Sequence, residues 1–275
     1  MNEKTFSYDD VNFHKTFAPQ DSYITKILEL AQQNYCGSKE EISIITGIPT
    51  GKTSGKVVPH IKYAKYMGLI SYSCEKGKYS LQLTELGILV LNEDPYLFED
   101  ITKLICHYNM ADGEQGALIW SFLYVQLPLM LNDSISISSL KKKADEFFQQ
   151  DVDFSPLKKA YTDGFWSTQN LIEFGNDFCI PNAYYNDGFR YLYAYTLLDS
   201  WDKQLNTVQE ITTDQITETL FWNKRFGFDY DEMIFALEEL EHMGYLQINK
   251  QLLPFTVIRT TNTSDILPHI YDSLG

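Results

Sequence analysis

The chain has 275 residues, a formal net charge of −15 and an apolar fraction of 44%. This apolar content can form buried cores and excludes extensive disorder, and the length favours two or three small units. No run reaches the roughly 18 consecutive apolar residues of a membrane span. The opening, MNEKTFSYDD, lacks the basic and apolar parts of a signal peptide. We therefore expect a cytoplasmic protein with no membrane partner.

Residues 1–20 are expected to form an N-terminal arm, followed by a three-helix unit. Asp21 or Ser22 can cap a helix that runs through Tyr35, and Ser38 with Glu41 forms a capping box for a second helix. A third helix should begin near residues 56–58, because Pro59 fits only in a first helical turn. Gly68 is expected to end it.

Two strands are predicted directly after the third helix. Leu69–Ser73 reads as one strand, Glu75–Lys78 as a tight turn, and the alternation of apolar and polar residues from Tyr79 to Leu83 as the second strand. Three helices followed by a hairpin indicate a winged helix-turn-helix domain over residues 21–91.

The charge distribution in this unit favours contact with DNA. Residues 47–74 contain four lysines and no acidic residue, although the whole chain is strongly acidic. In winged-helix proteins the third helix or the loop before it enters the groove, and the wing reaches phosphates. The predicted DNA-binding residues are Lys52, Thr53, Ser54, Lys56, His60 and Lys62, with Lys76 and Lys78 on the wing. The alternative is that these lysines only form a solvated face and that the fold is used for contact with proteins.

A related pattern returns in residues 206–275. A helix is expected from Thr213 or Asp214, a second from a cap at Asp229 to Met243, and strands at residues 245–248 and 255–258. There is no lysine or arginine from Asp229 to Gly244, but six acidic residues. This second winged-helix-like module should therefore contact proteins of a larger complex or a second copy of itself, unless the acids only form a solvated face.

Residues 92–205 read as a helical domain. Ala117–Leu127 is apolar nearly all round and should be a buried helix, and Ser155-Pro156 reads as a helix start. The predicted fold class is mainly α with small β-wings: a winged helix-turn-helix, a helical middle and a second winged-helix-like module.

The residues reveal no recognisable catalytic centre, and we expect no cofactor. The four cysteines are far apart and form no zinc pattern, so no metal site is predicted from them. Acidic pairs occur at Glu93/Asp94, Glu99/Asp100 and Asp112/Glu114. Carboxylates of this kind hold magnesium in metal-dependent nucleases, which leaves a DNA nickase or endonuclease as the enzymatic alternative.

Two short stretches resemble a known bacterial family. Asn12–Pro19 is similar to a His-x-Thr-Phe opening, and Glu93–Leu97, Leu104–Tyr108 and Trp120 are similar to an Asp-Pro-Tyr-Leu, Leu-Leu-His, Trp pattern. Both resemble domain-of-unknown-function family number 4007, over about the first 125 residues. Phe13 and Lys15 stand where the family pattern has glycine and glutamine.

The resemblance implies a cellular context. Members of that family are similar to components of phage-defence and DNA phosphorothioation clusters, and some are thought to nick DNA. Three hypotheses follow: a DNA-binding winged-helix subunit of such a system, a metal-dependent nickase of such a system, and a protein-interaction scaffold or transcriptional regulator.

Overall fold

The computed structural model describes residues 6–51, 55–129 and 134–274. These form two compact units, Met1–Ile180 and Pro181–Gly275. Helices predominate, and the described strands form three small three-stranded sheets. The predicted class, mainly α with small β elements, is confirmed at this level. No described helix is both long and apolar enough to cross a lipid bilayer.

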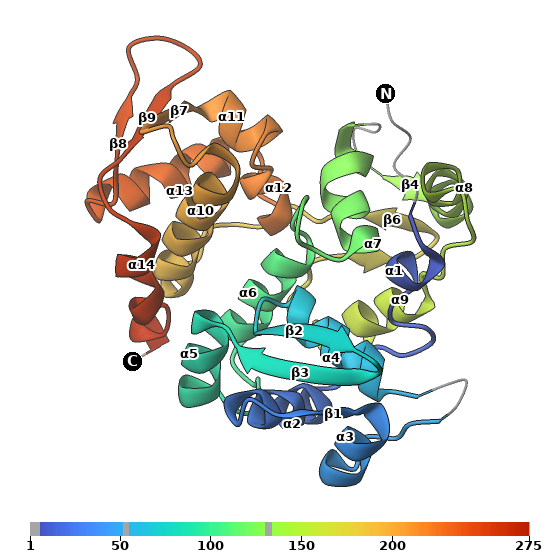
Figure 1. Ribbon diagram of the computed structural model, residues 1–275. Helices are drawn as coiled ribbons and strands as arrows, with labels where there is room; N and C mark the ends of the chain where they lie inside the picture. The colour runs from blue at the N-terminus through green and yellow to red at the C-terminus, as the bar shows by residue number, and fades with distance from the viewer. Residues whose placement is uncertain (1–5, 52–54, 130–133, 275) are drawn as a thin grey trace. The chain divides into compact units, whose positions relative to one another are not determined.

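The first sheet lies among the helices of the N-terminal part of the first unit (Figure 1). After α1 (Tyr8–Val11) the order is helix, strand, two helices and two strands. The strands pair antiparallel in the order β1-β3-β2. The elements are α2 (Asp21–Gln32), β1 (Cys36–Ser38), α3 (Lys39–Thr46), α4 (Val57–Tyr66), β2 (Ile70–Glu75) and β3 (Lys78–Leu83).

Local signals determine where most of these elements begin and end. The capping box of Ser38 and Glu41 opens α3, and left-handed Gly47 ends it. Pro59 lies in the first turn of α4, as predicted. Lys76 and Gly77 both have positive φ, which is the geometry of a two-residue hairpin turn. The sequence missed β1, and α2 ends three residues before the predicted Tyr35, at Gln32.

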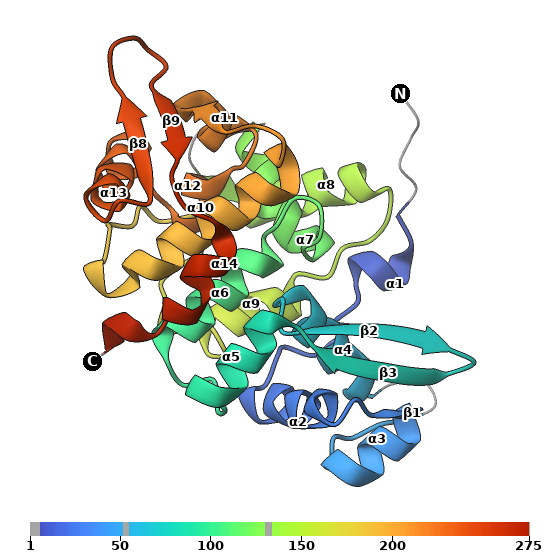
Figure 2. The ribbon, with the colours of Figure 1, turned by 60° about the vertical axis from the view of Figure 1, so that its left-hand side comes forward.

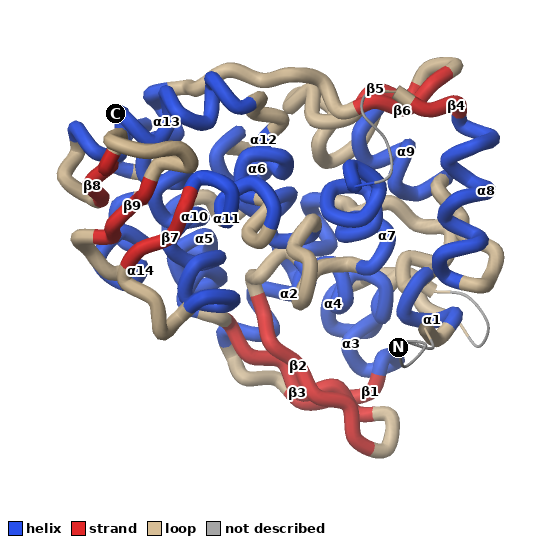
Figure 3. The backbone as a smooth tube through the Cα atoms, turned by 90° about the horizontal axis from the view of Figure 1, so that it is seen from above, coloured by secondary structure: helices blue, strands red, loops and turns tan. Residues whose placement is uncertain are grey.

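A second sheet in the first unit was not predicted. It follows α5 (Glu85–Glu93), α6 (Asp100–Met110), α7 (Leu118–Ser121), a π-helical turn (Phe122–Gln126) and a short 3-10 turn (Leu127–Leu129). Its elements are β4 (Ile135–Ser136), α8 (Ile137–Phe148), α9 (Ser155–Thr162), β5 (Glu173–Phe174) and β6 (Asp177–Cys179). The order β4-β6-β5 repeats the topology of the first sheet, and Figure 3 shows the two sheets as separate groups of strands.

Buried aromatic residues connect the helices of the first unit. The fully buried Trp120 donates its indole N–H to the hydroxyl of Tyr161 at 2.9 Å, and Nδ1 of His107 lies 2.6 Å from the same hydroxyl. Trp166 stacks on Tyr161 and donates to the carbonyl of Lys103. The predicted burial of the helix at residues 117–127 is confirmed.

The second unit has the same order of strands again, β7-β9-β8. After a 3-10 turn (Asp187–Phe189), its elements are α10 (Arg190–Leu205), β7 (Glu210–Thr212), α11 (Thr213–Glu218), α12 (Trp222–Phe226), α13 (Tyr230–His242), β8 (Leu246–Asn249), β9 (Thr256–Arg259), α14 (Thr263–Ile266) and 3-10 turns at Leu267–His269 and Asp272–Leu274. Figure 2 shows β8 and β9 as a hairpin whose connecting loop extends beyond both strands. Asp229 caps α13 as predicted, whereas α10 belongs to this unit rather than to a helical middle.

Gly87 is a position in the first unit where the neighbouring backbone leaves no room for a side chain. A Cβ there would lie 1.9 Å from the carbonyl oxygen of Leu69, which accepts the backbone N–H of Thr84. We predict that Gly87→Ala lowers the free energy of unfolding by about 2–3 kcal/mol, because the carbonyl must move and weaken that bond. Urea unfolding measures this. Gly175→Ala is the control, since its Cβ has no neighbour closer than 4.0 Å, and equal stability of the two variants would contradict the prediction.

Candidate nucleic-acid interface

The predicted DNA-binding residues separate into three groups in the structure. Lys52, Thr53 and Ser54 lie outside the described residues. Lys56, His60 and Lys62 are engaged with other parts of the first unit. Lys76 and Lys78 are exposed on the β2–β3 hairpin.

His60 does not reach the surface. It is fully buried on α4, its Nδ1 lies 2.7 Å from the carbonyl oxygen of Lys56, and its ring meets Tyr23 edge-on at 5.0 Å. Burial, together with the charge of Lys56, lowers the pKa of His60 to about 4. His60 is therefore not accessible to DNA in this structure, because packing against Tyr23 and Tyr63 encloses the ring.

The lysines of α4 make internal contacts. Lys56 is half-buried, with Nζ 5.3 Å from the ring centroid of Tyr23. Lys62 donates to the carbonyl of Asp9 at 2.8 Å and lies 3.8 Å from the carboxylate of Asp10. Lys65 lies over the ring of Tyr66, and burial lowers its pKa. Each of these three lysines therefore already interacts with a group inside the first unit.

Among the predicted residues that the structure describes, those at the hairpin tip present the most accessible positive charge. Lys76 occupies the turn with φ of 50°, and Lys78 opens β3 opposite Glu75. Both side chains are exposed, and no ion pair involves either of them within the described part of the chain. The opposed Glu75 reduces the local field without covering either ammonium group.

A groove of about 470 Å³ lies next to this tip, between α4 and the strands. Its lining includes Lys15, Lys39 and Lys62, with Asp9 and Glu40 as opposing charges. Sequence reasoning missed Lys15 and Lys39 because neither lies in the acid-free run. Lys39 donates to the carbonyl of Gly51 at 3.1 Å, so it also supports the loop that leads toward α4.

The family-like stretch at residues 12–19 is part of the packed unit rather than a detached arm. Asn12 donates to the carbonyl of Asp151 at 2.8 Å and accepts the N–H of Asp153 at 2.9 Å. His14 is fully buried and its ring lies 6.3 Å from that of Trp120. Burial lowers the pKa of His14. These residues hold α1 and the following turn against α7 and the segment before α9.

The acidic pairs proposed as magnesium ligands do not converge. Asp94 is buried, and its two carboxylate oxygens accept the N–H groups of Phe98 and Glu99, each at 2.9 Å. Asp112 accepts the N–H groups of Glu114 and Gln115. Over residues 6–51, 55–129 and 134–274, no group of three or more His, Cys, Asp or Glu side chains could hold a metal ion. Cys106 is buried, which raises its thiol pKa and makes it a poor nucleophile.

No protein-family model matches this chain, and no curated protein matches it. Among the solved structures that are similar in fold are two of SspB. A magnesium ion-bound SspB crystal structure has a TM-score of 0.77 and 16% identity, with 97% of this chain and 89% of that chain covered. An SspB crystal structure has a TM-score of 0.77 and 17% identity, with 99% and 90% covered. These likenesses span nearly the whole chain and establish the fold alone. The described residues of this chain do not fit a magnesium site.

The buried histidines predict a pH dependence of stability. Below its usual pKa of 6.5, His60 takes up a proton in the unfolded chain but stays neutral in the folded chain until about pH 4. The free energy of unfolding should therefore fall as the pH drops through this window, by at most about 1.4 kcal/mol per pH unit for His60. Urea unfolding between pH 7 and 5 measures the slope.

His60→Phe should reduce that slope, because this variant has no imidazole at position 60 to take up a proton in the unfolded chain. If wild type and His60→Phe have the same slope, protonation of His60 does not differ between the folded and the unfolded chain, and the prediction is wrong.

Proposed function

We propose that the chain is a DNA-binding subunit of a bacterial phage-defence or DNA-modification system of the phosphorothioation type. Three winged-helix-like modules would then be built on the strand orders β1-β3-β2, β4-β6-β5 and β7-β9-β8. A helix, a strand, two helices and a hairpin are the parts of such a module. The resemblance of residues 12–19 and 93–120 to family number 4007 supports the cellular context.

The observation that carries DNA binding is the exposed lysine pair of the first hairpin beside the lysine-lined groove. Lys76 and Lys78 lie at the tip, and the groove beside the tip brings together Lys15, Lys39 and Lys62. This arrangement fits a phosphate backbone running along α4 with the hairpin beside it. Such contacts determine affinity without reading base sequence.

The second unit suits a protein partner or self-association instead. Asp229 and Asp231 are exposed at the start of α13, where phosphate would be repelled. Leu252 and Leu253, on the loop between β8 and β9, are 80% and 75% exposed. An acidic helix with an apolar hairpin loop matches the composition of a protein interface better than that of a DNA surface.

A charge-reversed hairpin should lose DNA affinity. We predict that Lys76→Glu/Lys78→Glu weakens binding to a duplex oligonucleotide about tenfold or more at low salt, and that its plot of log affinity against log salt loses a slope of about 2, one for each phosphate contact. Fluorescence anisotropy over a salt series measures both quantities.

Lys158→Glu/Lys159→Glu is the matched control, because these two lysines are also adjacent and exposed, on α9. Affinity should fall only slightly in this control. If both double variants weaken binding equally, affinity follows net charge and the hairpin is not the contact; if the wild-type chain does not bind DNA at low salt, the proposal itself is wrong.

A further inference from the structure

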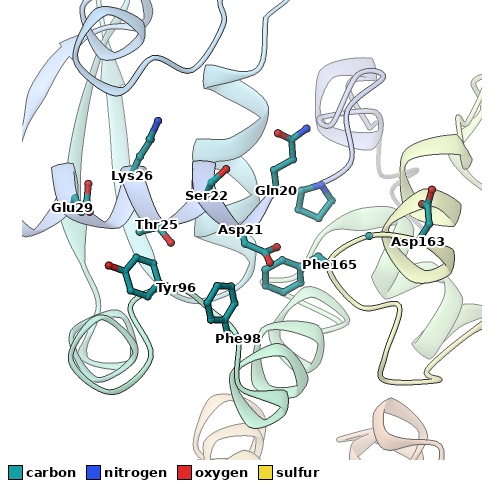
Figure 4. A pocket seen from close by; sticks show the side chains of 12 residues that line it. Gln20, Asp21, Ser22, Thr25, Lys26, Glu29, Tyr96, Phe98, Asp163 and Phe165 are labelled. Carbon is teal, nitrogen blue, oxygen red and sulfur yellow. The ribbon is translucent and has the colours of Figure 1, made fainter.

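A second cavity in the first unit has a different chemical character from the lysine-lined groove. It has a volume of about 720 Å³ and lies beside the start of α2, the loop before α6 and the loop after α9. Figure 4 shows the rings of Tyr96, Phe98 and Phe165 in a row, with the Asp21 carboxylate directed toward Phe165. This site plays no part in the proposed DNA contact.

The two outer rings are held in exposed positions by their own loop. Tyr96 is 63% and Phe98 69% exposed, and their rings stack with centroids 5.8 Å apart. Between them Leu97 is fully buried with φ of 58°, a left-handed conformation that is uncommon for residues other than glycine. Burial of the central residue fixes the loop and leaves the aromatic residues on either side facing solvent.

Hydrogen bonds make this display rigid. The Asp94 carboxylate accepts the N–H groups of Phe98 and Glu99, and the buried Thr25 of α2 donates to the carbonyl of Pro95 at 2.8 Å. Exposed stacked aromatic rings on a fixed loop need no reorganisation to receive a flat partner, which lowers the entropic cost of binding.

The charge of the lining identifies the kind of partner. Asp21, Glu29 and Asp163 contribute three carboxylates, and the only lysine of the lining, Lys26, donates its ammonium group to the carbonyl of Thr46 at 2.7 Å. Burial raises the pKa of Asp21, and the charge of Lys103 opposes this rise more strongly than the charge of Asp94 adds to it. A phosphate would be repelled, and a cation would be attracted.

We propose that this aromatic–acidic pocket binds an arginine-bearing segment of a protein partner. A guanidinium group is planar, stacks on aromatic faces and pairs with carboxylates in a fork-like geometry. Tyr96 and Phe98 supply the faces, and Asp21 and Asp163 supply the acceptors. The proposal does not depend on DNA binding by the hairpin, and it places a protein contact in the first unit.

The test uses the full chain and a fluorescein-labelled peptide of alternating glycine and arginine, titrated by anisotropy at physiological salt. Tyr96→Ala/Phe98→Ala should weaken peptide binding about tenfold, and Asp21→Asn/Asp163→Asn should weaken it several-fold. A peptide with lysine in place of arginine should bind less tightly, because an ammonium group does not stack. A peptide of glycine and glutamate should not bind.

Matched variants separate the pocket from the general acidity of the chain. Tyr8→Ala/Tyr184→Ala also removes two exposed aromatic side chains, and Glu146→Gln/Glu218→Gln also removes two exposed acids. Both should bind the peptide as wild type does, and so should Lys76→Glu/Lys78→Glu. Thermal unfolding checks that each variant is folded. If the double alanine variant is unstable, Phe98→Lys replaces it in the test: this substitution adds a cation at an exposed position and should repel the peptide.

Two results would overturn the inference. One is equal weakening in the pocket variants and their controls, which would mean that the peptide follows net charge. The other is loss of single-stranded oligonucleotide binding, with peptide binding intact, in Tyr96→Ala/Phe98→Ala; the pocket would then stack bases. If Lys76→Glu/Lys78→Glu does not change duplex binding, the proposed DNA contact is wrong, but the inference about the pocket is unaffected.

Discussion

The first unit depends on one buried hydroxyl group. Tyr161 of α9 accepts the indole N–H of Trp120 from α7 and lies within hydrogen-bond distance of His107 from α6. All three side chains are buried, so each polar atom must find a partner inside the protein. Two small sheet-containing modules, each too small to bury its own faces, share the core built around this hydroxyl. The surfaces that carry charge are attached to that core.

Packing also explains why the acid-free run is a weaker guide to DNA contact than its charge indicates. The buried face of α4 includes Val57, Ile61 and Ala64, and an acidic residue among them would cost desolvation free energy. On the same helix, Lys62 donates to the carbonyl of Asp9 and lies near the carboxylate of Asp10. The absence of acids is therefore partly a consequence of burial, and the charge that faces solvent lies mainly on the hairpin.

The sequence predicted elements whose signals are local. The capping box at Ser38, Pro59 in a first turn, and the Lys76-Gly77 turn each act over a few residues, and each was found where expected. The second sheet was missed because its strands are two or three residues long, too short for a period-two pattern. Lys15 and Lys39 were missed as groove residues because only the tertiary structure brings them beside Lys62.

Asp94 shows how an acidic pair can suggest one chemistry and have a different role in the structure. A pair of acidic residues suggests magnesium, yet both oxygens of this carboxylate accept backbone N–H groups. Among the described residues, no further His, Cys, Asp or Glu side chains join this carboxylate to form a group that could hold a metal ion. What it does instead is fix the loop on which Tyr96 and Phe98 are displayed. Its negative charge adds to the field of the aromatic–acidic pocket, so a residue that serves the backbone also favours a cationic partner and disfavours DNA there. The proposed DNA contact at the hairpin and the proposed ligand of this pocket would therefore place ligands of opposite charge on one unit.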